Sequence, residues 1–396
     1  MQAAATDDIL KELQRLGVLT PAEVVRARTS EEGRTGHTEP AKLLAAAGLT
    51  SFQVDTALFG KVERLVLGPY ILMNRIAEGG MGTVYQARHS RLGRMIALKV
   101  IRSDKLKSKV VARRFLREIR LIASLEHPHI VRAYDAGVIG DKIYLATEFV
   151  AGADLASYVR KNGPLPLPDA CRMIEQAARA LHHIHEHGLV HRDIKPSNLI
   201  RSDATGDIKL LDLGLCALPH DGARFDSQSG IITRNGVLLG TPDYISPEQA
   251  REPHSVDIRA DLYSLGCTFY FLLTGKPPFP GGTPVDKLMK HLFEPAPVLE
   301  NVPRNVSRLV ARLMAKDAAD RYANPLALAE AVRKLPDTTD NDTNPFASLI
   351  ESGEKFVPEA VTEGTSDGDT SRNWFWILGA LLTLIVSALL IARNLR

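Results

Sequence analysis

The segment 191–198 combines several side chains that a phosphate-transfer reaction requires, in the order His-Arg-Asp-Ile-Lys-Pro-Ser-Asn. Asp193 can accept the proton of an attacking hydroxyl group, and Lys195 can neutralise a γ-phosphate. The amide oxygen of Asn198 suits Mg²⁺, as does the carboxylate of Asp212, which stands fourteen residues further along the chain. These residue types predict the transfer of a phosphoryl group from a magnesium-nucleotide complex.

An upstream glycine-rich segment could hold the phosphates. It consists of Ile76, Ala77, Glu78, Gly79, Gly80, Met81, Gly82, Thr83 and Val84. Such a hairpin brings backbone N–H groups close to phosphate oxygens because glycine has no Cβ, although a glycine-rich segment alone is more often a simple turn. Fifteen residues after Val84, Lys99 stands in the strand-like run 95–101, where its burial would be costly without an anion nearby. A carboxylate should also hold this lysine, and Glu118 is the best candidate, although read alone it would be a surface helix residue.

In order and spacing, these motifs resemble those of the eukaryotic-type (Hanks-type) serine/threonine protein kinases. The shared motifs are the glycine-rich loop, Ala97-Leu98-Lys99, the His-Arg-Asp loop, Asp212-Leu213-Gly214 and Ser246-Pro247-Glu248. The Gly-Gly-Met-Gly form and the helical leader are similar to bacterial members, in particular planctomycete ones. The resemblance implies ATP and Mg²⁺ as cofactors and protein serines and threonines as substrates. It also implies an α+β, two-lobed kinase fold with a small β-rich N-lobe, carrying one regulatory helix, and a larger helical C-lobe.

The resemblance assigns a role to each matching residue. Lys99 would contact the α- and β-phosphates and pair with Glu118. Asp193 would be the catalytic base, while Asn198 and Asp212 would be the Mg²⁺ ligands.

Further roles concern the hinge and the supports of the site. Thr147 would be the gatekeeper, Glu148 and Val150 would offer backbone hydrogen bonds to adenine, and Asp154 could meet the ribose. As structural roles, Asp261 would brace the His-Arg-Asp backbone and Arg321 would pair with Glu248.

The resemblance also indicates specificity and regulation. Lys195 and Thr241, within Gly240-Thr241-Pro242, favour serine/threonine over tyrosine substrates. Arg192 is typical of kinases that are switched by a phosphorylated activation loop, and Thr233 is the best candidate for autophosphorylation there. Two residues depart from the family pattern. Ala77 replaces the first loop glycine, which predicts weaker or slower nucleotide binding, and Leu213 replaces phenylalanine.

The kinase-like region spans residues 70–335, and the residues before it predict a separate helical part of the chain. Residues 1–67 should form short helices, with an apolar face on Ile9, Leu10, Leu13 and Leu16 and capping boxes at Thr20-Pro21-Ala22-Glu23 and Thr50-Ser51-Phe52-Gln53. They could be a small interaction module or a simple helical extension. Within 70–335, the run 143–149 predicts a strand, and 113–125 predicts the amphipathic helix that carries Glu118.

The C-terminal part predicts a membrane anchor. Residues 336–372 are acidic and poor in large apolar side chains, which predicts a disordered linker. Residues 374–392 carry no charge and are long enough for one transmembrane helix, the alternative being a buried core helix. Because ATP is intracellular, the kinase domain would signal from the cytoplasmic face of a membrane that the chain crosses once.

Composition excludes other classes. The net charge is +3, from 49 basic and 46 acidic residues, so a nucleic-acid partner is not expected. Three distant cysteines form no zinc or disulfide pattern, and the histidines at 182–191 lack a carboxylate or thiol that would complete a metal site. The alternative to an active enzyme is a pseudokinase, a membrane-tethered nucleotide-binding scaffold. A membrane-concentrated homodimer could phosphorylate itself in trans.

Overall fold

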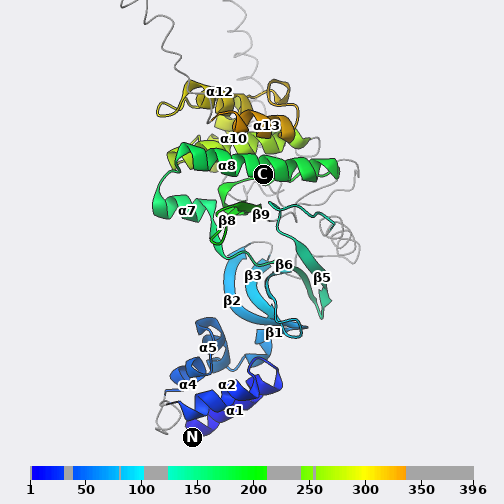
Figure 1. Ribbon diagram of the computed structural model, residues 1–396, viewed down its shortest axis with the longest axis vertical. Coiled ribbons are helices and arrows are strands. Elements are labelled where there is room, and N and C mark those ends of the chain that lie inside the picture. Colours follow the sequence, from blue (N-terminus) through cyan, green and yellow to red (C-terminus); the bar gives the residue numbers. More distant parts are fainter. Residues whose placement is uncertain are drawn as a thin grey trace, which may run out of the picture. The chain divides into compact units, whose positions relative to one another are not determined.

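The computed structural model describes residues 2–30, 39–79, 82–101, 124–211, 242–252 and 256–335 (Figure 1). The chain divides into two units, Met1–Asp340 and Asn341–Arg396, and all described residues belong to the first. The predicted linker at 336–372 and the predicted span at 374–392 therefore lie outside the described residues. Within the described ranges, no helix has both the length and the apolar character needed to cross a bilayer.

The N-terminal residues form short helices, as predicted. These elements are α1 (Gln2–Arg15), α2 (Pro21–Thr29), α4 (Pro40–Ala46), α5 (Ser51–Leu58) and the 3-10 helix η1 (Val62–Leu65). Both capping boxes are present, with Thr20 and Thr50 as the N-caps of α2 and α5. Leu10 and Leu13 of α1 are buried in one apolar cluster, which also contains Ile71 of the neighbouring sheet. The predicted apolar face of α1 is thus confirmed.

A six-stranded antiparallel sheet follows, in the order β1-β2-β3-β4-β6-β5. Its strands are β1 (Val66–Leu67), β2 (Tyr70–Gly79), β3 (Gly82–His89), β4 (Met95–Ile101), β5 (Ala133–Ile139) and β6 (Lys142–Glu148). Strand β4 spans the predicted run around Lys99, and β6 agrees with the predicted strand to within one residue. The predicted helix around Glu118 lies outside the described residues up to position 123.

The rest of the described chain is mostly helical. A three-stranded sheet of β7 (Gly152–Asp154), β8 (Leu199–Ser202) and β9 (Ile208–Leu210) lies beside the helices. The helices are α7 (Leu155–Asn162), α8 (Leu167–Glu186), η3 (Pro196–Asn198), α9 (Pro247–Arg251), α10 (Ile258–Thr274), α11 (Pro284–Phe293), α12 (Arg304–Leu313), η5 (Ala318–Asp320) and α13 (Pro325–Arg333). Helix α8 packs against α10 and α13 (Figure 1), and Tyr263 and Phe269 of α10 are fully buried in the core of this part. A β-rich part and a helical part are therefore both present, as expected of an α+β fold.

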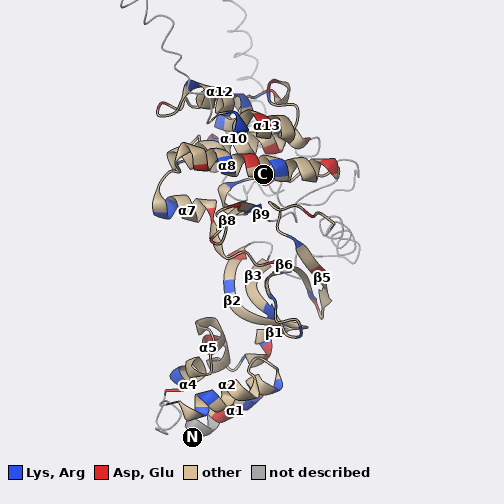
Figure 2. Ribbon diagram, viewed as in Figure 1, with Lys and Arg blue, Asp and Glu red and all other residues tan. Residues whose placement is uncertain are grey.

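Backbone and side-chain contacts join the two parts. Ile130 bridges to Leu210 of β9, and the N–H of Val131 donates to the carbonyl of Leu210 over 3.0 Å. Lys209 of β9 and Glu148 of β6 form an ion pair of 2.9 Å. Basic and acidic residues are both scattered over the described elements (Figure 2), which accords with the small net charge.

A row of imidazole rings lies where the chain approaches α8. The ring of His127 stacks on His183 with centroids 5.4 Å apart, and His183 contacts His187 at 4.6 Å. Burial, followed by the charges of His129 and His183, lowers the pKa of His127 from 6.5 to about 4. The described histidines, cysteines and acidic residues form no group of three that could hold a metal ion.

This row predicts a loss of stability in mild acid. Because the fold keeps His127 neutral while the unfolded chain binds a proton near pH 6.5, the unfolded state takes up more protons below that pH. The free energy of unfolding should therefore fall by about 1–2 kcal/mol for this residue between pH 6.5 and about pH 5. Urea unfolding at the two pH values measures the change. His127→Gln should reduce it, and the remainder should come from buried His291, whose pKa is lowered to about 3, and from His183, whose pKa is lowered chiefly by burial. An unchanged pH dependence in His127→Gln would contradict the assignment.

Candidate active site

Asp193, Lys195 and Asn198 meet in the loop between α8 and β8. The ammonium of Lys195 lies 3.0 and 2.8 Å from the two carboxylate oxygens of Asp193. The amide nitrogen of Asn198 donates to the Asp193 carboxylate at 3.0 Å and to the Asp193 carbonyl at 2.7 Å. The structure therefore brings together the predicted base, its lysine and one predicted metal ligand, and it orients the carboxylate from two sides.

Asn198 has the geometry of a metal ligand. Its side chain is 6% exposed, and both hydrogen bonds to Asp193 use the amide nitrogen, so the amide oxygen is left as the ligand atom. The backbone carbonyl of Asn198 accepts a hydrogen bond of 2.8 Å from the N–H of Leu211. Leu211 directly precedes Asp212, so the two predicted ligands are connected through one backbone contact. A hard oxygen donor at this place fits Mg²⁺.

The backbone of this loop is held by a buried carboxylate. Asp261 of α10 is fully buried and accepts hydrogen bonds from the N–H groups of His191, at 2.8 Å, and Arg192, at 2.7 Å. Arg192 has a φ of 67°, in the left-handed region that is unfavourable for residues with a Cβ. Its carbonyl accepts from the side chain of Gln249 at 2.9 Å. The predicted brace by Asp261 is confirmed, and it holds a strained residue directly before Asp193.

The ring of His191 connects this loop to the end of β9. Its Nδ1 accepts from the N–H of Asp193 at 3.3 Å, so Nε2 carries the proton and donates to the carbonyl of Leu211 at 3.0 Å. Burial raises the pKa of Asp261, while the backbone N–H groups of His191 and Arg192 act in the opposite direction. The carboxylate is therefore held by fixed donors in place of water.

The predicted phosphate-binding segment is a β-hairpin. Ala77 pairs with Val84 and Gly79 with Gly82, while Val84 also faces Lys99 of β4. A Cβ at Gly82 would lie 2.1 Å from the carbonyl oxygen of Val100, so only glycine fits there. Glu78 and Thr83 pair with each other in the same ladder, whereas Ile76 lies at a register shift of β2 between Arg75 and Ala77. Lys99 thus stands beside the hairpin, as the motif spacing predicted.

The hinge residues have more structural partners than the sequence indicated. Glu148 uses its N–H to bond the carbonyl of Arg132 at 2.8 Å, so only its carbonyl remains for adenine. The carboxylate of Asp154 accepts from the N–H of Ser157 at 2.9 Å and so caps α7, which leaves its second oxygen for a ribose. Val150 follows the end of β6 and is partly exposed.

Six predicted site residues lie outside the described residues. These are Gly80, Met81, Glu118, Asp212, Thr233 and Thr241.

Residues 70–333 match the family model of the protein kinase domain. The chain belongs to the protein kinase family. The match covers the hairpin, Lys99, the Asp193 loop and Asp261, which are the features that form the site.

Curated relatives support the same conclusion. The chain is 39% identical to the serine/threonine-protein kinase PknA of Mycobacterium tuberculosis over 305 residues, 76% of this chain and 68% of the relative. It is 38% identical to PknB of Mycobacterium leprae over 261 residues, 64% of this chain and 40% of the relative. With PrkC of Bacillus subtilis it shares 31% identity over 355 residues, 84% of this chain and 53% of the relative. The chain thus spans between 40% and 68% of the length of these three relatives. The expected serine/threonine-type kinase domain of bacterial character is confirmed.

An ion pair joins α9 to the segment that follows η5 in the helical part of the kinase domain. The guanidinium of Arg321 contacts both carboxylate oxygens of Glu248, at 2.6 and 2.9 Å, and donates to the carbonyl of Arg259 at 2.8 Å. Its side chain is fully buried, and its guanidinium lies 5.0 Å above the ring of Tyr263. The predicted pairing of Arg321 with Glu248 is confirmed.

Sequence reasoning missed two supports of the kinase site. Lys209 pairs with the hinge residue Glu148, and Gln249 holds the carbonyl of Arg192. Both stand next to recognised motifs, since Lys209 is three residues before Asp212 and Gln249 follows Glu248 directly. Proximity to a motif was the only available signal, because long-range partners are set by the fold.

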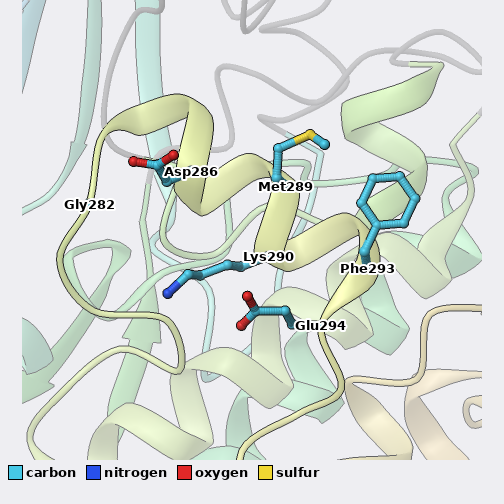
Figure 3. Close-up of a pocket in the computed structure, with 6 residues that line it drawn as sticks. All are labelled: Gly282, Asp286, Met289, Lys290, Phe293 and Glu294. Carbon is cyan, nitrogen blue, oxygen red and sulfur yellow. The ribbon is translucent and has the colours of Figure 1, made fainter. Parts of the chain in front are cut away.

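A surface hollow on α11 is separate from the nucleotide residues. It is lined by Gly282, Asp286, Met289, Lys290, Phe293 and Glu294 (Figure 3). Met289 and Phe293 are 49% and 64% exposed, and none of the predicted site residues lines the hollow. This hollow therefore contributes nothing to the assignment of the nucleotide site.

Proposed function

We propose that the whole chain is an ATP-dependent serine/threonine protein kinase that transfers the γ-phosphoryl group of ATP to protein hydroxyls. The observation that carries this proposal is the contact of both Lys195 and Asn198 with the carboxylate of Asp193. A scaffold protein has no need of a carboxylate oriented in this way. The family and the names of the relatives support the same activity.

Each residue of the site has a proposed role. The carboxylate of Asp193 accepts the proton of the substrate hydroxyl, and Lys195 stabilises the negative charge near it. Lys99 holds the α- and β-phosphates together with Glu118, and the backbone of the glycine hairpin covers them. Asn198 and Asp212 would hold Mg²⁺. When bound, the magnesium-nucleotide complex supplies the phosphoryl group and cations around a charged transition state.

Labelled ATP tests the proposed activity. The purified full chain, incubated with Mg²⁺ and γ-labelled ATP, should transfer label to itself or to a generic protein substrate, and a chelator should abolish the transfer. Lys99→Met should also abolish it, because methionine keeps the length of the side chain without its charge. Nucleotide binding with no transfer by the wild-type chain would favour the alternative, a pseudokinase that acts as a nucleotide-binding scaffold.

Regulation through the activation loop is part of the proposal. Arg192 would bind a phosphate on that loop, Thr233 is the proposed acceptor, and Thr241 would contact the catalytic residues. Mapping of phosphorylated residues after the labelling reaction tests this. If Thr233→Ala left both the activity and the phosphate content of the loop unchanged, the assignment would be wrong.

We further propose that residues 374–392 anchor the kinase in a membrane, with residues 336–372 as an acidic linker and the catalytic part on the cytoplasmic face. The uncharged length of 374–392, flanked by arginines, supports this. Removal of 374–392 should release the protein from membranes washed with alkaline carbonate. Release of the intact chain by the same wash would contradict the anchor.

Two finer proposals concern origin and assembly. The Gly-Gly-Met-Gly loop and the helical leader support a planctomycete-like bacterial kinase. A membrane-concentrated homodimer would phosphorylate its activation loops in trans. Mixing active chains with the inactive Lys99→Met variant tests the second proposal, since label should appear on the inactive chain.

A further inference from the structure

The glycine hairpin consists of the paired strands β2 and β3. The pairing of β2 with β3 is interrupted by two register shifts. Leu72 pairs with Ala87 and Asn74 with Gln86, so Met73 is an extra residue opposite two consecutive residues of β3. A second shift leaves Ile76 as the extra residue between Arg75 and Ala77. Such bulges bend a strand and increase its twist. The direction of the hairpin therefore depends on what holds β2 at these points.

Helix α5 of the N-terminal module holds the first bulge. The hydroxyl of Thr50 donates to the carbonyl of Met73, and the side-chain amide of Gln53 donates to the carbonyl of Leu72 at 2.9 Å. Gln53 is 1% exposed, so its amide has no access to water as an alternative partner. Strand β1 pairs with β2 only as far as Ile71. Helix α5 thus donates hydrogen bonds to β2 directly after the last residue of β2 that pairs with β1.

The same helix also contacts the strand that returns from the hairpin. The rings of Phe52 and Tyr85 of β3 have centroids 5.9 Å apart, and Phe52 packs against the apolar clusters of both the helices and the sheet. Helix α5 therefore contacts β2 through the side chains of Thr50 and Gln53, and β3 through the ring of Phe52.

The hydrogen bonds of the α5 capping box and those from α5 to β2 form one network, because Thr50 and Gln53 take part in both. Thr50 accepts from the N–H of Gln53 at 3.3 Å, and Gln53 accepts from the N–H of Thr50 at 3.1 Å. The other capping box, of Thr20 and Glu23, is exposed and forms its hydrogen bonds within the first turn of α2. The two boxes have the same local chemistry, but only the one at Thr50 reaches the sheet.

We propose that Thr50 and Gln53 are positioning residues for the nucleotide, acting through the bulge at Met73 on the glycine hairpin. The helical module thereby sets the affinity for the nucleotide phosphates. This inference rests on the proposed kinase function. It gives the N-terminal helices a role in the reaction itself.

Matched substitutions in the two capping boxes test the inference. Gln53→Glu keeps an acceptor for the N–H of Thr50 but removes the donor to Leu72, whereas Glu23→Gln makes the reverse exchange in the exposed box. The loss of a hydrogen bond to β2 should weaken binding of MgADP about threefold to tenfold in Gln53→Glu. Glu23→Gln should leave it unchanged within about twofold. Titration calorimetry on the full-length protein measures both dissociation constants.

A second pair of variants tests the inference independently, because Gln53→Glu places a charge at a buried position and could unfold the protein. Thr50→Val loses the donor to Met73, whereas Thr50→Ser retains it and should restore wild-type affinity. Far-UV circular dichroism checks the fold. In the labelling assay, Thr50→Val should raise the KM for ATP with little change in kcat or in the KM for the protein substrate, a pattern that a general loss of folded protein does not produce.

The outcomes separate the two hypotheses. Failure of the folded wild-type chain to bind MgADP would overturn the proposed function, and the inference with it. Equal binding by wild type, Thr50→Val and Gln53→Glu would overturn the inference alone and leave the kinase function intact.

Discussion

Replacement of Asp193 by asparagine is expected to lower the rate of phosphoryl transfer by about 10²- to 10⁴-fold. Asparagine has the same shape and can still accept from Lys195, but its amide cannot take the proton of the substrate hydroxyl. It also removes the anion that both Lys195 and the amide of Asn198 contact within 3.0 Å. The large effect follows because the proton acceptor and the orientation of its neighbours are lost together.

The measurement is the initial rate with labelled ATP at saturating protein substrate. Binding of MgADP should change by less than about threefold, because the phosphates are held mainly by the hairpin and Lys99. Asp169→Asn, at an exposed position in the first turn of α8, is the matched control and should keep wild-type activity. Retention of more than a tenth of the activity by Asp193→Asn would rule out its role as the base.

Replacement of Asp261 by alanine is expected to impair both stability and catalysis. The side chain is fully buried and accepts from the N–H groups of His191 and Arg192. Loss of the acceptor would leave two buried donors unsatisfied, which should lower the free energy of unfolding by about 2–4 kcal/mol. Arg192 would also lose one of the contacts that hold its backbone at a φ of 67°.

Activity should fall further than the loss of folded protein accounts for. A shift of about 1 Å in the loop that carries Asp193 is enough to cost about 100-fold in rate. Asp257→Ala is the control, since this exposed residue caps the same helix by accepting from the N–H of Arg259 at 2.8 Å. It should cost about 1 kcal/mol and leave kcat unchanged. Denaturant unfolding and kcat of the folded fraction measure the two effects, and equal behaviour of the two variants would contradict the brace.

The residues of the site were predictable because each residue type has a function in phosphoryl transfer and stands at a characteristic spacing from the others. Asp193, Lys195 and Asn198 lie within six consecutive positions, so their closeness in the chain already brings them near one another. The strand around Lys99 was predictable from its apolar run, and both helix starts from their capping boxes. These are local properties, and the structure confirms them.

Contacts between segments that are distant in the chain were harder to predict from the sequence. Asp261 and Arg321 were assigned only by resemblance to a family, since nothing in their neighbouring residues indicates a partner 69 or 73 positions away. The pairing of Lys209 with Glu148 was missed for the same reason. An ion pair across 61 positions leaves no periodic pattern in the sequence.

By itself, the sequence determined the chemistry of this protein: a carboxylate, an amide, two lysines and a glycine-rich turn suited to a magnesium nucleotide. Only the tertiary structure decided what supports them, including the attachment of the N-terminal helices to β2. The physical reason is that the carbonyls of Leu72 and Met73 need partners from outside the sheet where β1 ends and β2 bulges, a condition that arises only once the strands have paired.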